Sequence, residues 1–395
     1  MQRSANFLCQ TKNMLMKRGF GVFLSAALFL APACKKAAMP LAERVSVNGS
    51  VNGDSVTVYV AGGIFVQDPV TGKQTLYAIC WKNGVATPLT TDNWSFATCI
   101  TLSGNDVYVG GGMSTANRFN MATYWKNGNP VTLTDGSTDA RITALAINGQ
   151  DVYAVGWLTA ADGFPVATCW KNGVADELES DSFYSVANGI AISGNDVYVV
   201  GQFMNGHLDS STVVVWKNGV AQPLSGYPFS YATSVVSSGS DVYVGGTSTS
   251  GSGYSNGATV WENGSLDWAV DYPIIGQVNS LALSGSDVYA AGIHTEPGGA
   301  TTATWWKNGV QLGLSGPVDS VFAVGIAING QDVYLAGGTG YGYLTQNDDL
   351  ALYWKNGVPV TLKNSVVSPV KNGTDSTGLY ANGIAVKSNQ VVPAD

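Results

Sequence analysis

Residues Ile190–Gly201 read I-A-I-S-G-N-D-V-Y-V-V-G, and this stretch decides the fold. Two apolar runs flank a Ser-Gly-Asn-Asp turn, which is the pattern of a β-hairpin. A second element, W-K-N-G with an apolar lead-in, follows at Trp216–Gly219. Its Asn-Gly pair favours a type I′ hairpin turn, because both central residues of that turn need positive φ.

The two elements recur seven times along the chain. The tryptophan of W-K-N-G returns every 44 to 48 residues, and the tyrosine that follows valine returns every 45 to 49 residues. The tryptophans are Trp81, Trp125, Trp170, Trp216, Trp261, Trp306 and Trp354. The tyrosines are Tyr59, Tyr108, Tyr153, Tyr198, Tyr243, Tyr289 and Tyr334. Two independent markers with one period indicate a structural repeat.

Each repeat contains four segments with strand character, which we name strands A to D. Examples are Ile142–Ile147, Val288–Gly292, Ala122–Trp125 and Val131–Leu133, in that order. A repeated four-stranded meander predicts an all-β fold, a seven-bladed β-propeller of four-stranded antiparallel blades. The last strand A, Ala381–Val386, has no complete blade after it. We therefore expect the C-terminal strand to complete the first blade and close the ring, which leaves no open sheet edge.

The N-terminus carries an export pattern. Lys17 and Arg18 precede an apolar run, Phe20–Leu30, and then small residues. This order predicts a secretory signal, and the run is too short to span a membrane. We expect residues 1–33 as signal peptide, 34–55 as a lipidated N-terminus and tether, and 56–395 as the propeller. Met14 and Met16 are alternative starts to Met1.

Ala33-Cys34-Lys35-Lys36 resembles the processing site of bacterial lipoproteins, although Ala31 stands where that family prefers Leu. The resemblance implies that Cys34 becomes the first mature residue and carries lipid. It implies a place in the bacterial cell envelope, as an outer-membrane lipoprotein that is periplasmic or surface-exposed. Simple secretion is the alternative. The N-terminal lipid would be the only attachment to a membrane.

The charge balance excludes some partners. The net charge changes from −8 to −12 when residues 1–33 are removed, because they carry four basic residues and no acidic one. Nucleic acid needs a positive surface, and so does binding to anionic lipid by charge. Of the cysteines beyond the export region, we expect Cys80, Cys99 and Cys169 to be small buried hydrophobic residues. A Cys80–Cys99 disulfide is the alternative.

A meander fixes which loops share an end of the ring. The A–B and C–D turns lie at one end and are nearly identical between repeats, whereas the B–C and D–A loops lie at the other end and vary. Loops that vary on a rigid scaffold commonly carry function, and exposed aromatic rings stack on sugars and apolar groups. The candidate ligand-binding residues are Trp94, Phe96, Trp157, Phe183, Tyr184, Tyr227, Phe229, Tyr231, Trp268, Tyr272, Tyr341 and Tyr343.

Catalytic and metal-binding patterns are weak. Gly253–Gly257 matches G-x-S-x-G but lies between strands, and His207 and His294 lie in repeats that are not adjacent. Asn347–Asp349 offers only a short acidic cluster for calcium, so we expect no metal and no cofactor. Carboxylate pairs for glycoside hydrolysis remain an alternative on the variable end. The candidates are Asp92, Asp139, Glu179, Asp181, Asp271 and Asp319.

The repeat resembles WD-repeat and kelch-type β-propellers, although Lys follows the Trp in most repeats and the Gly-His signature is missing. It also resembles bacterial lipoproteins built from V-Y-V-A-G and W-K-N-G units, a resemblance that implies an envelope propeller and no activity. We expect a monomeric, non-catalytic binding or interaction module that holds a glycan or an envelope protein on the variable end. The alternatives are a carbohydrate-active hydrolase or lyase and a structural scaffold of an envelope complex.

Overall fold

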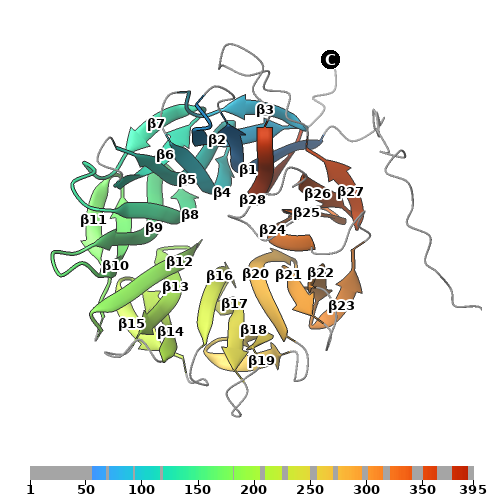
Figure 1. Ribbon diagram of the computed structural model, residues 1–395. Coiled ribbons are helices and arrows are strands. Elements are labelled where there is room, and N and C mark those ends of the chain that lie inside the picture. The colour runs from blue at the N-terminus through green and yellow to red at the C-terminus, as the bar shows by residue number, and fades with distance from the viewer. Residues whose placement is uncertain are drawn as a thin grey trace, which may run out of the picture. The chain divides into compact units, whose positions relative to one another are not determined.

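The computed structural model describes residues 56–67, 71–91, 94–115, 119–180, 182–204, 210–224, 230–249, 256–269, 275–295, 301–314, 321–339, 350–362 and 376–389. These residues form seven antiparallel sheets of four strands each, arranged as blades around a central axis (Figure 1). The predicted all-β, seven-bladed propeller is therefore confirmed. Within the described ranges, no helix is long and apolar enough to cross a membrane.

The strands are given blade by blade, from the axis outward. Blade 1 contains β28 (Ser376–Ser388), β1 (Val56–Gln67), β2 (Gln74–Lys82) and β3 (Val85–Pro88). Blade 2 contains β4 (Ser95–Ser103), β5 (Asp106–Ser114), β6 (Asn120–Lys126) and β7 (Asn129–Thr132). Blade 3 contains β8 (Ala140–Asn148), β9 (Asp151–Thr159), β10 (Pro165–Lys171) and β11 (Val174–Glu177). Blade 4 contains β12 (Tyr184–Ser193), β13 (Asp196–Met204), β14 (Ser211–Lys217) and β15 (Val220–Pro223).

The remaining blades follow the same order. Blade 5 contains β16 (Tyr231–Ser238), β17 (Asp241–Thr249), β18 (Asn256–Glu262) and β19 (Ser265–Ala269). Blade 6 contains β20 (Ile275–Ser284), β21 (Asp287–Thr295), β22 (Thr301–Lys307) and β23 (Val310–Gly313). Blade 7 contains β24 (Val321–Asn329), β25 (Asp332–Thr339), β26 (Ala351–Lys355) and β27 (Val358–Thr361).

The ring closes as the sequence predicts. The C-terminal strand β28 pairs antiparallel with β1, so that Val60 lies opposite Ile384. Blade 1 thus joins the first and the last parts of the described chain (Figure 1). Ala381 and Ile384 pack with Val58 and Val60 in one apolar cluster, which holds the closing strand in place.

The repeated tryptophans fill the space between neighbouring blades. Trp216 of blade 4, for example, is fully buried and packs in one cluster with Tyr153 and Cys169 of blade 3. Burying a large ring stabilises a fold by about 1.5–3 kcal/mol, so these contacts are a main source of stability between blades. The cysteines Cys80, Cys99 and Cys169 are free, and burial raises the pKa of Cys80 and Cys99 to about 12. The alternative of a Cys80–Cys99 disulfide is therefore not realised.

Side-chain contacts connect the A–B turn of a repeat to its C–D turn. The turn asparagine has positive φ in every repeat, for example +51° at Asn127, as a type I′ turn requires. Its side chain accepts the Val107 N–H at 2.9 Å and donates to Asp106 at 2.8 Å. Asp106 also pairs with Lys126 at 2.9 Å. The aspartate therefore ties the A–B turn of the blade to its C–D turn.

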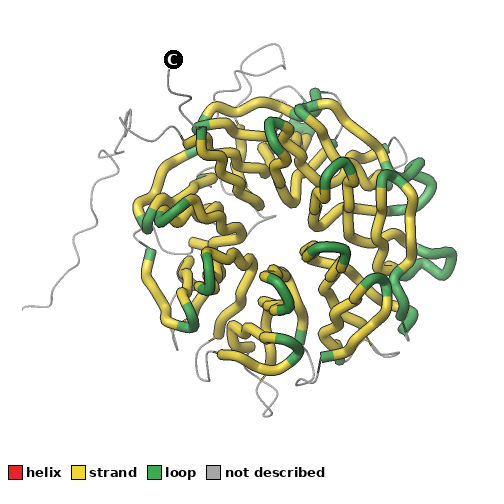
Figure 2. The backbone as a smooth tube through the Cα atoms, turned by 180° about the vertical axis from the view of Figure 1, so that it is seen from behind, coloured by secondary structure: helices red, strands yellow, loops and turns green. Residues whose placement is uncertain are grey.

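Each innermost strand contains a β-bulge. In all seven blades the pairing of the inner strand skips one residue, for example between Ala187 and Gly189 in β12. A Cβ on Gly201 would lie 1.9 Å from the Val186 carbonyl oxygen just before this bulge, so the final glycine of the opening stretch is required for close approach. Figure 2 shows the ring from behind, with short turns joining the strands.

Candidate functional site

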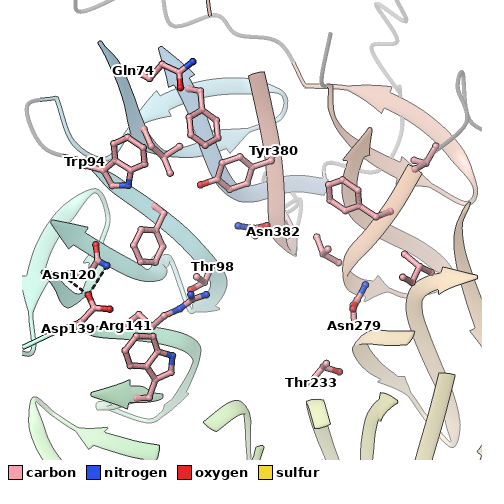
Figure 3. A pocket seen from close by; sticks show the side chains of 18 of the residues that line it. Gln74, Trp94, Thr98, Asn120, Asp139, Arg141, Thr233, Asn279, Tyr380 and Asn382 are labelled. Carbon is pink, nitrogen blue, oxygen red and sulfur yellow. Dashed lines mark hydrogen bonds between the residues drawn. The ribbon is translucent and has the colours of Figure 1, made fainter. Parts of the chain in front are cut away.

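A cavity of about 770 Å³ lies in the middle of the ring, among the ends of the inner strands (Figure 3). Its lining residues sit where the first strand of a blade begins, where the second ends and where the third begins. This is the end that carries the B–C and D–A loops, which the sequence analysis singled out. The volume is in the range of sites that hold small molecules, about 300–1,000 Å³.

Aromatic rings form one wall of the cavity. Three of the predicted aromatic residues, Trp94, Phe96 and Trp157, line it. Phe65 and Tyr380 line it as well, and the Phe65 ring lies 6.2 Å from Trp94 and 6.0 Å from Tyr380. The exposed ring of Trp94 stands at the rim, with 40% of its surface accessible. This wall offers flat apolar faces of the kind on which sugar rings and apolar groups stack.

Sequence reasoning missed Phe65 and Tyr380 because it searched the loops. Tyr380 takes the same place in its repeat as Phe96, Arg141 and Phe322, two residues before the bulged residue of the inner strand. All four of these side chains line the cavity. A comparison of this repeat position across the seven inner strands is the signal that would have found Tyr380.

The other described aromatic candidates are not among the lining residues. Phe183 packs edge-on against Phe164 at 4.6 Å, and Tyr184 lies at the start of β12. Burial raises the pKa of Tyr231, whose hydroxyl donates to Gln277 at 3.4 Å. Trp268 lies in the outer strand β19 rather than in a D–A loop, and its ring packs 5.7 Å from Trp306. The candidates outside the described residues are Cys34, Tyr227, Phe229, Tyr272, Tyr341 and Tyr343.

One carboxylate and one guanidinium face the cavity from the start of blade 3. Asp139 immediately precedes β8 and Arg141 is the second residue of that strand, and both side chains line the cavity. The Asp139 carboxylate oxygen Oδ1 accepts hydrogen bonds from the backbone and side-chain amides of Asn120, both at 2.8 Å (Figure 3). The Ser114 hydroxyl donates to Asn120 Oδ1 at 2.7 Å and fixes that amide in turn.

Arg141 is held differently. Its guanidinium carbon lies 5.5 Å from the centre of the Phe96 ring, a cation–π distance. Its Nε atom is buried without a hydrogen-bond partner among the described residues. Figure 3 shows the guanidinium directed toward the middle of the cavity, near Thr98. Arg141 and Asp139 are the only charged side chains among the described residues that line the cavity.

The expected carboxylate pair does not assemble within the described residues. Of the six candidates, Asp139 alone lines the cavity. Glu179 lies elsewhere, because its carboxylate accepts the Ala221 N–H at 3.0 Å and its carbonyl oxygen accepts Trp216 Nε1 at 2.6 Å. Asp92, Asp181, Asp271 and Asp319 lie outside the described residues. A two-carboxylate glycosidase centre therefore cannot be drawn from this part of the chain.

Five of the seven bulged residues of the inner strands line the cavity, and the four polar ones among them already have structural partners. Thr98 donates to the Ile142 carbonyl of the next blade at 2.7 Å, and Asn279 donates to the Ala323 carbonyl at 2.7 Å. Asn382 does the same to Ala97 at 2.7 Å. His294 contacts Gln311 and does not line the cavity, and His207 lies outside the described residues. Within the described ranges, no group of three or more His, Cys, Asp and Glu side chains is placed to hold a metal ion.

Comparisons with known proteins agree on the fold. No protein family model matches the sequence, and no curated protein matches it. Among solved structures, the chain is similar to the acylaminoacyl peptidase of Pyrococcus horikoshii, with 13% identity, a TM-score of 0.50, and coverage of 78% of this chain and 51% of that one. It is also similar to the β-propeller domain of the Trilobed protease from Pyrococcus furiosus, with 12% identity, a TM-score of 0.49, and coverage of 80% and 95%. A puromycin-hydrolyzing peptidase of Mycobacterium tuberculosis shows 14% identity, a TM-score of 0.49, and coverage of 79% and 54%.

These similarities correct the leading functional expectation. The chain spans about half the length of the two peptidases. At such identities the likeness establishes the β-propeller fold and no activity. The acylaminoacyl peptidase is by its name a hydrolytic enzyme, and on that comparison the expectation of a non-catalytic binding or interaction module is withdrawn. The narrower resemblance to bacterial W-K-N-G lipoproteins is not established by them.

Proposed function

We propose that the protein is a carbohydrate-active enzyme, a hydrolase or lyase, whose reaction takes place in the central cavity. The observation that carries this proposal is the placement of Asp139, a carboxylate held through one oxygen beside an aromatic wall. A general acid or base must be within hydrogen-bond reach of the proton that it transfers, and must be held in one orientation.

The surroundings of Asp139 support a role in proton transfer. Two amide donors bind Oδ1, so the carboxylate is held in one orientation. Trp94, Phe96 and Trp157 supply flat surfaces close to this carboxylate. Stacked rings would position a saccharide, and the backbone of the inner strands would keep the site rigid.

The location of the enzyme is part of the proposal. The basic and apolar segment before Cys34 supports export, and Ala33-Cys34 supports lipid attachment in a bacterial envelope. A bacterial culture that expresses the chain should incorporate labelled palmitate into the wild-type protein and not into the Cys34→Ser variant. Equal labelling of both proteins would remove the lipid anchor from the proposal and leave the cavity untouched.

Activity is tested with the full chain and a panel of neutral and acidic polysaccharides. New reducing ends measure cleavage of either kind, and the ultraviolet absorbance of an unsaturated product separates elimination from hydrolysis. We expect cleavage of at least one polysaccharide. The Asp139→Asn variant keeps the shape of the side chain, and its rate should fall at least 100-fold, as is typical for loss of a general acid or base.

Asp176→Asn is the matched control, because Asp176 is an exposed carboxylate on the outer strand of the same blade. It should cleave at the wild-type rate. A wild-type rate in Asp139→Asn, with cleavage intact, would remove Asp139 from the reaction. No cleavage of any polysaccharide in the panel would overturn the proposed function.

A further inference from the structure

We propose that Arg141 makes the central cavity an anion site, and that the saccharide bound there carries a carboxylate. The inference deepens the proposed function, on which its saccharide part rests, by naming the chemical class of the ligand. The chain is acidic overall, with a net charge of −8, yet the single described arginine points into the cavity.

Arg141 lacks the partner that such a residue normally has. Five lysines of the opposite end form ion pairs with aspartates, at 2.7 to 3.0 Å. No described carboxylate forms an ion pair with Arg141, although Asp139 stands two residues away. The Asp139 oxygen Oδ1 is turned to the amides of Asn120 instead. A half-buried guanidinium without an anion is costly, and a bound anion would remove that cost.

The surroundings select a carboxylate. A guanidinium binds a carboxylate through two parallel N–H···O bonds, and one guanidinium balances one negative charge. A phosphate group would call for more positive charge than Arg141, because no other described cation lines the cavity. The guanidinium lies against the Phe96 ring, which limits the directions that its terminal nitrogens can take.

The same cavity provides for the rest of a saccharide. Trp94 and Trp157 offer ring faces, and the amides of Asn120 and Gln74 offer hydrogen-bonding groups. Asp139 repels a second acidic group close by, so we expect one carboxylate of an acidic saccharide at Arg141 and its other carboxylates directed away from Asp139. An acidic sugar ring fits this pattern better than a chain of acidic amino acids, which lacks a stacking face.

The test is calorimetric titration of the full chain with trigalacturonate, its methyl ester and triglutamate. The ester keeps the sugar ring and removes the charge, and triglutamate keeps the charge and removes the ring. We expect trigalacturonate to bind at least tenfold more tightly than either of the others, and its affinity to fall with added salt.

Two variants place the effect on Arg141. Arg141→Met retains an apolar stem on Phe96 and should lose at least tenfold in affinity for trigalacturonate, while its affinity for the ester stays the same. Arg141→Lys keeps the positive charge but cannot form the two parallel hydrogen bonds of a guanidinium. Its affinity for trigalacturonate should lie between those of the wild type and Arg141→Met. Lys171→Met is the matched control, because it removes one positive charge from the same blade at the opposite end, and it should bind like the wild type.

The remaining outcomes separate the two proposals. Equal binding of acid and ester, no binding of any probe, or wild-type affinity in Arg141→Met would each overturn the anion site. Tighter binding of triglutamate than of trigalacturonate would overturn the saccharide part of the proposal. Carboxylate-selective binding without cleavage of any polysaccharide would keep the anion site and overturn the enzyme. Cleavage of neutral polysaccharides alone would keep the proposed enzyme and overturn the anion site.

Discussion

The most regular feature at the residue scale is the cluster of Asp, Asn, Lys and Tyr side chains at the turn end of the blades. Asp196 shows it clearly, because Lys217 pairs with it at 2.8 Å and Asn218 donates to it at 2.9 Å. The ammonium group of Lys217 also lies 5.3 Å from the centre of the Tyr198 ring. Blade 5 departs from the pattern, since Glu262 replaces the lysine and accepts the Tyr243 hydroxyl at 3.0 Å.

These clusters predict a dependence of stability on acid pH. Hydrogen bonds from Lys217 and Asn218 hold the pKa of Asp196 below its ordinary value, and those from Asn127 and Lys126 do the same for Asp106. A lowered native pKa contributes stability above the unfolded pKa, and this contribution is lost as pH falls through the native pKa. The wild-type urea midpoint should therefore fall between about pH 5 and about pH 2.

The matched variant carries Asp106→Asn, Asp151→Asn and Asp196→Asn together. It should be less stable than the wild type at neutral pH, because the ion pairs are gone. The difference between the two midpoints should shrink as the pH falls, because the wild-type carboxylates become neutral too. A constant difference at every pH would show that the charges of these aspartates do not contribute.

At the scale of elements, the bulged residue joins its blade to the next in six of the seven inner strands. Thr143 of β8 illustrates the link, because its hydroxyl lies 2.8 Å from the Ala187 carbonyl of blade 4 and 2.9 Å from the Val155 carbonyl of its own blade. The bulged residues are Thr98, Thr143, Asn188, Thr233, Asn279, Val324 and Asn382. Val324 alone has no polar group, so the joint from blade 7 to blade 1 lacks this hydrogen bond.

This difference predicts two opposite effects of nearly isosteric substitutions. Thr143→Val removes the hydroxyl and should lower the free energy of unfolding by about 1–2 kcal/mol, because the two carbonyls lose the one hydroxyl proton that they share. Val324→Thr supplies the missing donor at the closing joint and should raise it by about 0.5–1.5 kcal/mol. Urea unfolding followed by tryptophan fluorescence measures both. Destabilisation by Val324→Thr would contradict the assignment of that joint.

The bulges also explain what the sequence could and could not predict. The repeat period placed the strands, because alternation and Asn-Gly turns are local signals. The direction of Arg141 and Tyr380 depends on a bulge two residues further along, which no local pattern announces. Function was therefore expected in the loops, and the Asp139–Arg141 pair was not recognised as a unit. Trp268 was misplaced for a related reason, because the longer strand β19 takes it into the outer edge of blade 5.

At the scale of the whole molecule, the closing strand β28 makes the ring one unit. It supplies the innermost strand of blade 1, and with it Tyr380 and Asn382 of the cavity. A chain that ends at residue 375 should lose its cooperative thermal transition and aggregate, because β1 would expose a full edge of unpaired backbone groups. A chain that ends at Asn389 is the control and should unfold like the wild type.

Circular dichroism and gel filtration distinguish the outcomes. A cooperative transition and a monomeric elution volume in the chain without β28 would contradict closure as a source of stability. The sequence could predict this closure, because the last inner strand has no blade of its own. It could not predict that the closing blade also completes the cavity, since that depends on how the blades meet around the axis.

The most direct measurement is a crystal structure of the Asp139→Asn variant grown with trigalacturonate. The account predicts one saccharide in the central cavity, with a carboxylate bound by Arg141 and a sugar ring against Trp94 or Trp157. A saccharide on the outer surface of the ring, or one in the cavity with its carboxylates turned away from Arg141, would contradict it.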